Sequence, residues 1–156
     1  MRVHTLDCEL ITPASLEDTF RIFEDPYNLA RITPPWMGFE ILTPDLKMRE
    51  GLEIDYRFRW LGLPMTWKTL ITAYVPPHLF VDEALISPYA LWRHRHQFEE
   101  TPRGTIVRDH VDYALPLGPL GDFAHTLVVR KQVEEIFAFR QTRIAELIGA
   151  AGPVSG

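Results

Sequence analysis

The sequence contains a single cysteine, Cys8, among its 156 residues. Internal disulfides and metal sites built from several cysteines are therefore excluded. Net positive charge is also lacking, because 16 basic and 21 acidic side chains give a formal charge of -5 at pH 7. This balance argues against nucleic acid as a partner, since phosphate backbones attract basic surfaces. Glycine-rich phosphate loops and nucleophile motifs are missing too, and no cofactor is expected.

Long apolar runs are absent as well. No stretch approaches the roughly 18 uncharged apolar residues that suggest a membrane-spanning helix. The first eleven residues include Asp7 and Glu9 and do not resemble a signal peptide. We therefore expect a cytoplasmic protein without a membrane span. The length predicts one domain at residues 1–150, followed by a flexible tail at 151–156.

Aromatic residues, in contrast, are plentiful at 12% of the chain. In residues 52–60, Tyr56, Phe58 and Trp60 alternate with charged residues, which predicts a strand with one dry and one wet face. In residues 65–75 the same alternation places Trp67 and Val75 on the dry face. Further strands are predicted at residues 2–11, 79–85, 89–99 and 105–115.

Two regions show helical spacing. Ser15 is a candidate N-cap for a first helix that ends at Asp25-Pro26, with a second short helix after it. A long C-terminal helix is predicted from about residue 120 to 148. Its apolar residues change face by about half a turn near Val128 to Lys131. This predicts either a break there or a first segment that packs against something other than the sheet, which leaves room for a homodimer.

Three ionisable residues fall on the predicted dry faces. His94 and His96 alternate with the charged residues of the 89–99 strand, and Asp109 has an inward position on the next strand. Because a buried carboxylate needs a partner or a proton, three interpretations are open. The residues form an internal hydrogen-bonded network, orient a ligand in a cavity, or act as a catalytic acid and base. No metal site is expected, because His110 lies on the opposite face and no third ligand is found.

Short motifs spread over nearly the whole chain match one family pattern. They are Pro26-Tyr-Asn-Leu29, Ile32-Thr-Pro-Pro-Trp36, Gly62-Leu-Pro64, Pro76-Pro-His-Leu-Phe-Val-Asp-Glu83, Pro88-Tyr89, Trp92-Arg-His-Arg-His-Gln-Phe98 and Asp109-His-Val-Asp-Tyr-Ala-Leu-Pro116. Together they resemble the START-like, or SRPBCC, superfamily, and within it the bacterial single-domain branch described as ligand-binding or cyclase/dehydrase-like. Ala84 and Ser87 depart from the pattern, which has Gln and Gly at these places.

The resemblance implies an α+β, helix-grip fold. In that fold a curved seven-stranded antiparallel sheet wraps around a long C-terminal helix, with one or two short helices after the first strand. It also implies a cavity between the sheet and the helix. Members of the superfamily bind lipids, sterols, polyketides or hormones, and some catalyse cyclisation and dehydration of polyketides.

The expected function is therefore binding of a small hydrophobic, ring-containing molecule, such as a lipid, sterol or polyketide. The predicted ligand-binding residues are the inward-facing aromatic residues and one loop tryptophan: Trp36, Tyr56, Phe58, Trp60, Trp67, Trp92, Phe98 and Tyr113. The alternative is a cyclase/dehydratase-type enzyme without a metal. In that case His94 or His96 acts as general acid or base, and Asp109 sets the tautomer.

Overall fold

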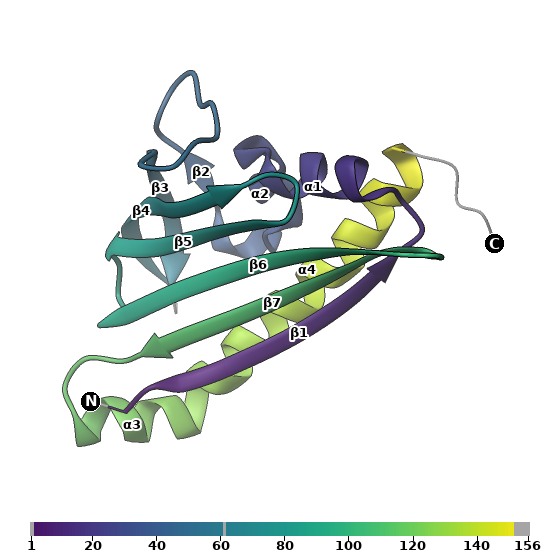
Figure 1. Ribbon diagram of the computed structural model, residues 1–156. Helices are drawn as coiled ribbons and strands as arrows, with labels where there is room; N and C mark the ends of the chain where they lie inside the picture. Colours follow the sequence, from purple (N-terminus) through teal and green to yellow (C-terminus); the bar gives the residue numbers. More distant parts are fainter. Residues whose placement is uncertain (1, 61, 152–156) are drawn as a thin grey trace.

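A single antiparallel sheet wraps around a long helix in the computed structural model, which describes residues 2–60 and 62–151 (Figure 1). The strands are His4–Thr12 (β1), Glu40–Ile41 (β2), Glu53–Trp60 (β3), Leu63–Val75 (β4), Leu79–Ile86 (β5), Leu91–Thr101 (β6) and Gly104–Ala114 (β7). Their order in the sheet is β1-β7-β6-β5-β4-β3-β2. The expected helix-grip fold is confirmed. The predicted tail at 151–156 lies outside the described residues, apart from Ala151.

The helices lie after β1 and after β7. They are Leu16–Glu24 (α1), Pro26–Ile32 (α2), the 3₁₀ turn Pro35–Met37 (η1), Pro119–Ala124 (α3), the π-helical turn His125–Val129 (η2) and Arg130–Ala151 (α4). The predicted N-cap is confirmed, because the Ser15 hydroxyl accepts a hydrogen bond from the Asp18 N–H at 3.1 Å. None of the described helices is long and apolar enough to cross a membrane.

The change of face in the C-terminal helix arises from the turn η2. A π-helical turn adds a residue to the helical repeat and rotates the side chains that follow it. From Val129, the last residue of this turn, onward, Val129, Val133 and Phe137 are buried in a cluster with residues of the sheet. Before Val129, apolar side chains are left exposed at Leu117, Leu120, Phe123, Leu127 and Val128. The helical segment is therefore continuous, and a homodimer through this apolar surface stays a prediction.

The alternation of dry and wet residues is confirmed in β3, where Tyr56 and Phe58 are buried and Arg57 is exposed. In β4 it breaks down, because the pairing with β5 shifts between Ile71 and Ala73. Such an irregularity reverses which side chains point inward. The expected inward position of Val75 is therefore wrong: its side chain is exposed, and the ring of Tyr74 packs into the core instead.

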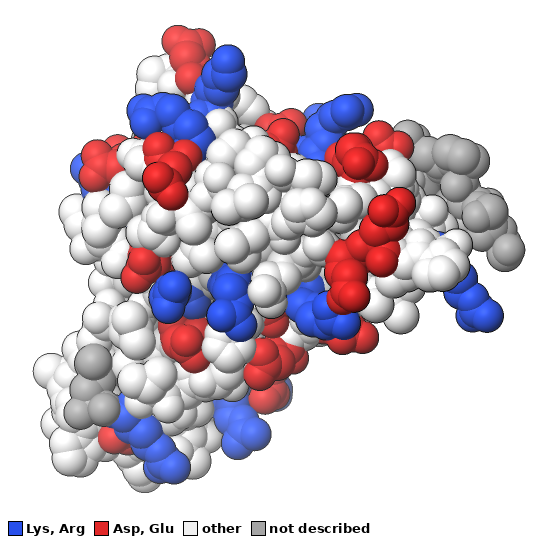
Figure 2. Space-filling model, in the orientation of Figure 1, with Lys and Arg blue, Asp and Glu red and all other residues white. Residues whose placement is uncertain are grey.

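The outer face of the sheet carries acidic and basic side chains interspersed over β1, β6 and β7 (Figure 2). Arg108 on β7, for example, lies between Glu9 on β1 and Glu99 on β6. Mixed charges of this kind are typical of a solvated sheet face. We therefore expect the functional side chains on the opposite, inner face, which α4 covers.

Candidate functional site

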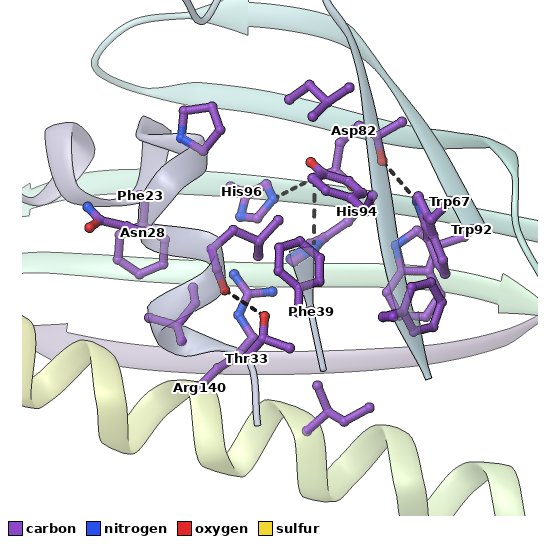
Figure 3. A pocket seen from close by; sticks show the side chains of 18 of the residues that line it. Phe23, Asn28, Thr33, Phe39, Trp67, Asp82, Trp92, His94, His96 and Arg140 are labelled. Carbon is purple, nitrogen blue, oxygen red and sulfur yellow. Dashed lines mark hydrogen bonds and ion pairs between the residues drawn. The ribbon is translucent and has the colours of Figure 1, made fainter. Parts of the chain in front are cut away.

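A cavity of about 180 Å³ lies between the inner face of the sheet, α2 and α4 (Figure 3). Its wall is mainly apolar and rich in aromatic rings from β3, β4, β5, β6 and α4, among them Tyr56, Phe58, Trp60, Trp67, Phe80, Trp92 and Phe137. The volume is similar to that of an engineered apolar cavity of about 150 Å³ that holds benzene. In this conformation the cavity therefore has room for a small ring system.

The aromatic wall is fixed by ring contacts and hydrogen bonds. The Trp67 ring meets the Trp92 ring edge-on, with centroids 5.4 Å apart. The indole N–H of Trp67 donates to the Thr69 hydroxyl at 2.9 Å, and that of Trp60 points to the Tyr89 hydroxyl at 3.4 Å. Because burial raises the pKa of Tyr89 to about 12, its hydroxyl stays protonated near neutral pH. The aromatic part of the wall is thus held together by ring contacts and hydrogen bonds, and the Tyr89 hydroxyl adds no charge to it.

The predicted ligand-binding residues fall into two groups. Those that line the cavity are Tyr56, Phe58, Trp60, Trp67 and Trp92. The lining of the described cavity does not include Trp36, Phe98 or Tyr113. Trp36 is 64% exposed, Phe98 packs in a core cluster with Phe20, and the Tyr113 hydroxyl lies 2.7 Å from His125 Nε2. A role in ligand binding stays a prediction for all eight.

Four ionisable side chains meet at one side of the cavity, on the adjacent strands β5, β6 and β7. Asp82 lies opposite His94, and Asp109 lies opposite His96. The closest contacts are diagonal, because His94 Nε2 is 2.8 Å from Asp109 Oδ1 and His96 Nε2 is 2.8 Å from Asp82 Oδ2. We call these four residues the inner His/Asp cluster.

Aromatic rings enclose the two histidines of this cluster. The imidazole rings stack with centroids 3.7 Å apart, and the Phe80 ring stacks on His96 at 4.0 Å. The Phe137 ring meets His94 edge-on at 5.4 Å. Both histidines are only 3% exposed. Since water is largely excluded, the cluster must satisfy its own charges and hydrogen bonds.

Burial and the two carboxylates shift the histidine pKa values in opposite directions. Burial, together with the neighbouring His96, lowers the pKa of His94 to about 4, despite the hydrogen bond to Asp109. Burial also lowers the pKa of His96, but contacts with Asp109 and Asp82 outweigh this and raise it overall. Desolvation raises the pKa of both carboxyls, yet the two histidines hold Asp82 below and Asp109 well below the usual range. Near neutral pH, His94 is therefore neutral and both carboxyls are ionised.

Sequence reasoning placed His94, His96 and Asp109 together but missed Asp82. Alternation gave no clear signal for it, because Phe80 and Val81 are both buried on its strand. Arg140 contributes a positive charge to the same region. It extends from α4 into the cavity, its guanidinium lies 5.2 Å from the centroid of the Phe137 ring, and its charge helps to lower the pKa of Asp82 (Figure 3).

A curved antiparallel sheet around a C-terminal helix, with an internal cavity, defines the helix-grip class of proteins. The model of the family "Polyketide cyclase / dehydrase and lipid transport" matches residues 12–137. The chain belongs to this SRPBCC-type family, and the resemblance seen in the sequence motifs is confirmed.

Solved structures with the same fold cover almost the whole chain. Protein Ms6760 from Mycobacterium smegmatis is 21% identical, with 96% of this chain and 92% of that chain covered and a TM-score of 0.66. TTHA0849 from Thermus thermophilus is 18% identical, with coverages of 97% and 99% and a TM-score of 0.71. A norcoclaurine synthase point mutant from Thalictrum, in complex with a transition-state analogue, is 14% identical, with both coverages at 94% and a TM-score of 0.67. At these identities the likeness concerns the fold. No curated protein matches the sequence.

Proposed function

We propose that the protein binds a small hydrophobic, ring-containing molecule in the cavity between the sheet and α4. The observation that carries this proposal is the cavity itself, with its aromatic wall and a few polar groups on one side. Cavities of this composition bind apolar ligands through the wall and orient them through the polar groups. The family description, which includes polyketide cyclisation and lipid transport, agrees with a ligand of this class.

The size of the cavity narrows the choice within this class. About 180 Å³ matches one or two rings, whereas a four-ring sterol or a long polyketide requires the cavity to open further. We therefore expect small aromatic compounds to bind without rearrangement of the wall. Larger ring systems should bind more weakly or more slowly, because they must first displace cavity-lining side chains.

Thermal unfolding with a graded panel of ligands tests this proposal. The panel runs from indole and naphthalene derivatives to a sterol and a fatty acid. A ligand present at about 100 times its Kd adds about 2.7 kcal/mol to the free energy of unfolding, which raises the Tm of a domain this size by about 5 °C or more. If no member of the panel raises the Tm, the proposal is wrong.

Two matched variants of α4 locate the binding site. Ile136 lines the cavity, so Ile136→Trp fills it and should remove the rise in Tm. Ala138 lies on the same helix and is exposed, so Ala138→Trp should keep that rise. Loss of the effect in both variants, or in neither, would place the ligand elsewhere on the protein.

A second candidate function is a cyclase/dehydratase-type reaction on a polyketide-like substrate. It is favoured by one observation, namely that His94 and His96 both line the cavity while their pKa values are shifted apart. Such a separation suits an acid and a base working together. A neutral His94 accepts the proton from a substrate carbon, and a protonated His96 donates one to the departing hydroxyl, so that water is lost. Asp109 fixes which ring nitrogen of the histidines carries the proton.

Turnover of a polyketide-like substrate by His96→Gln separates this candidate from simple binding. If the protein is an enzyme, the variant should bind the substrate but lose at least about 100-fold in turnover, since general acid catalysis contributes about that much. His110→Gln, on the outer face, should turn over normally. Equal turnover by both variants would eliminate the acid–base role.

A further inference from the structure

The nitrogen atoms of the inner His/Asp cluster are divided between its two carboxylates. Asp109 Oδ1 lies 2.8 Å from His94 Nε2 and 3.1 Å from His96 Nδ1. Asp82 Oδ2 faces the other nitrogen of each ring, 2.8 Å from His96 Nε2 and 4.0 Å from His94 Nδ1. Each imidazole therefore has one nitrogen toward Asp109 and the other toward Asp82.

This division sets up a particular pair of tautomers. A neutral imidazole has one N–H donor and one lone pair. If Asp109 takes up both N–H groups, the lone pairs of His94 Nδ1 and His96 Nε2 are directed toward Asp82. One ligand atom each from Asp82, His94 and His96 then lie within 4.8 Å of one another. Among the described residues, only these three form such a group.

We propose that Asp82, His94 and His96 bind one divalent transition-metal ion, and that Asp109 orients both imidazoles from the far side. Metal-bound histidines almost always donate their second N–H to a carboxylate, a carbonyl or water, which is the role left for Asp109. Two imidazoles and one carboxylate with a free coordination position suit zinc or iron(II). Because all three ligands line the cavity, the free position faces the space proposed for the ligand.

The side chains need only small movements to bind an ion. With bonds of about 2.0–2.1 Å, neighbouring ligand atoms of a tetrahedral site lie about 3.3 Å apart. The 2.8 Å contact between Asp82 and His96 must therefore widen by about 0.5 Å, and the 4.0 Å distance between Asp82 and His94 must shorten by about 0.7 Å. Without an ion, a proton between Asp82 and His96 occupies the same place.

A metal site was not expected from the sequence because no third ligand was found on the inner face. Asp82 supplies that ligand. His96 Nδ1 adds a second observation, because it is buried and lacks a hydrogen bond of good geometry although Asp109 lies nearby. Coordination of His96 by an ion would let the ring turn toward the metal and align this N–H with Asp109.

Zinc titration of the chelator-treated protein by calorimetry at pH 7.5 tests the proposal. One equivalent of Zn²⁺ is expected to bind the wild-type protein. Asp82→Asn should weaken binding at least about 100-fold, and Asp109→Asn about 10- to 100-fold, in line with the effect of removing carboxylates that support metal ligands. His110→Ala is the matched control, because His110 lies between two aspartates on the outer face. It should bind zinc like the wild type.

Absence of saturable binding, or loss of binding in His110→Ala but not in Asp82→Asn, overturns the proposal. Near-UV circular dichroism of each variant shows whether it is folded. If Asp82→Asn is unfolded, the wild-type protein loaded with Co²⁺ decides the question. Visible absorption bands of a four- or five-coordinate ion, with shifted NMR signals from two imidazole N–H protons, support the site, and the spectrum of aqueous Co²⁺ contradicts it. None of these readouts depends on the organic ligand, so failure here leaves the proposed function intact.

Discussion

The two faces of β7 carry the same kinds of residue in different surroundings. Asp109 points inward and joins the inner His/Asp cluster. The next residue, His110, points outward between Asp7 at 2.6 Å and Asp112 at 3.2 Å. We call Asp7, His110 and Asp112 the outer His/Asp cluster. The two clusters have similar chemistry and similar contact distances, and they lie on opposite sides of one sheet.

Exposure separates the two clusters. The side chains of His94 and His96 are 4% exposed, whereas that of His110 is 31% exposed. In the outer cluster, water and salt can replace any contact that is lost. In the inner cluster a lost contact leaves a buried polar group without a partner. The comparison teaches that alternation along the strand, rather than residue type, decides which histidines belong to a site.

The largest difference in stability loss between the two clusters is expected when one carboxylate is removed from each. Asp109→Ala removes the carboxylate that contacts both buried imidazoles and should lower the free energy of unfolding by about 3–5 kcal/mol. Asp112→Ala removes an exposed partner of His110 and should cost less than about 1 kcal/mol. Urea unfolding at pH 7 measures both values. Similar losses in the two variants would mean that the clusters do not differ as described.

The lowered pKa of His94 gives a second test of how burial sets the inner cluster apart from the outer one. Its pKa in the folded protein, about 4, is below the unfolded value of 6.5, so the unfolded chain takes up a proton first as the pH falls. The stability contributed by neutral His94 should therefore be complete above pH 6.5 and be lost toward pH 4, on the order of 3 kcal/mol.

The stability contributed by His96 depends on pH in the opposite direction, because the pKa of His96 is raised. Its contribution is complete below pH 6.5 and is lost as the pH rises through the folded value. Imidazole ¹⁵N NMR of the chelator-treated protein follows both rings separately. Protonation of His94 near pH 6 or above would show that burial does not control its charge.

The smallest difference in stability loss is expected between two variants that each remove a threonine hydroxyl. The buried Thr69 hydroxyl accepts a hydrogen bond from the Trp67 indole, whereas the exposed Thr5 hydroxyl donates to Asp112. Thr69→Val should cost about 1–2 kcal/mol because the indole N–H loses its acceptor. Thr5→Val should change stability by less than about 0.5 kcal/mol. The same urea unfolding experiment measures both, and a larger effect for Thr5→Val would reverse the comparison.

Much of the fold and part of the candidate site could be predicted from alternation and family resemblance. Alternation works where a strand is regular, so that the inward positions of Tyr56, Phe58, His94, His96 and Asp109 were all predicted correctly. It fails where the pairing shifts, as between Ile71 and Ala73, because the sequence alone does not show which residues bulge. That shift explains the wrong prediction for Val75.

Two further features depend on information that a pattern along one strand does not contain. Asp82 joins the site through the register between β5 and β6, which is set by partners distant in sequence. Its own strand shows no clean alternation, since Phe80 and Val81 are both buried. The turn η2 was visible only as a change of face in the helix. A π-helical turn and a break leave the same pattern in the sequence.

The central claim, that the cavity binds a small ring-containing molecule, is tested most directly by the tryptophan indole N–H signals in ¹H–¹⁵N NMR spectra. Of the four tryptophans, Trp60, Trp67 and Trp92 line the cavity, and Trp36 does not. Titration with a small aromatic ligand should shift the signals of these three and leave that of Trp36 in place. Shifts confined to Trp36, or no shift with any ligand of the panel, would contradict the claim.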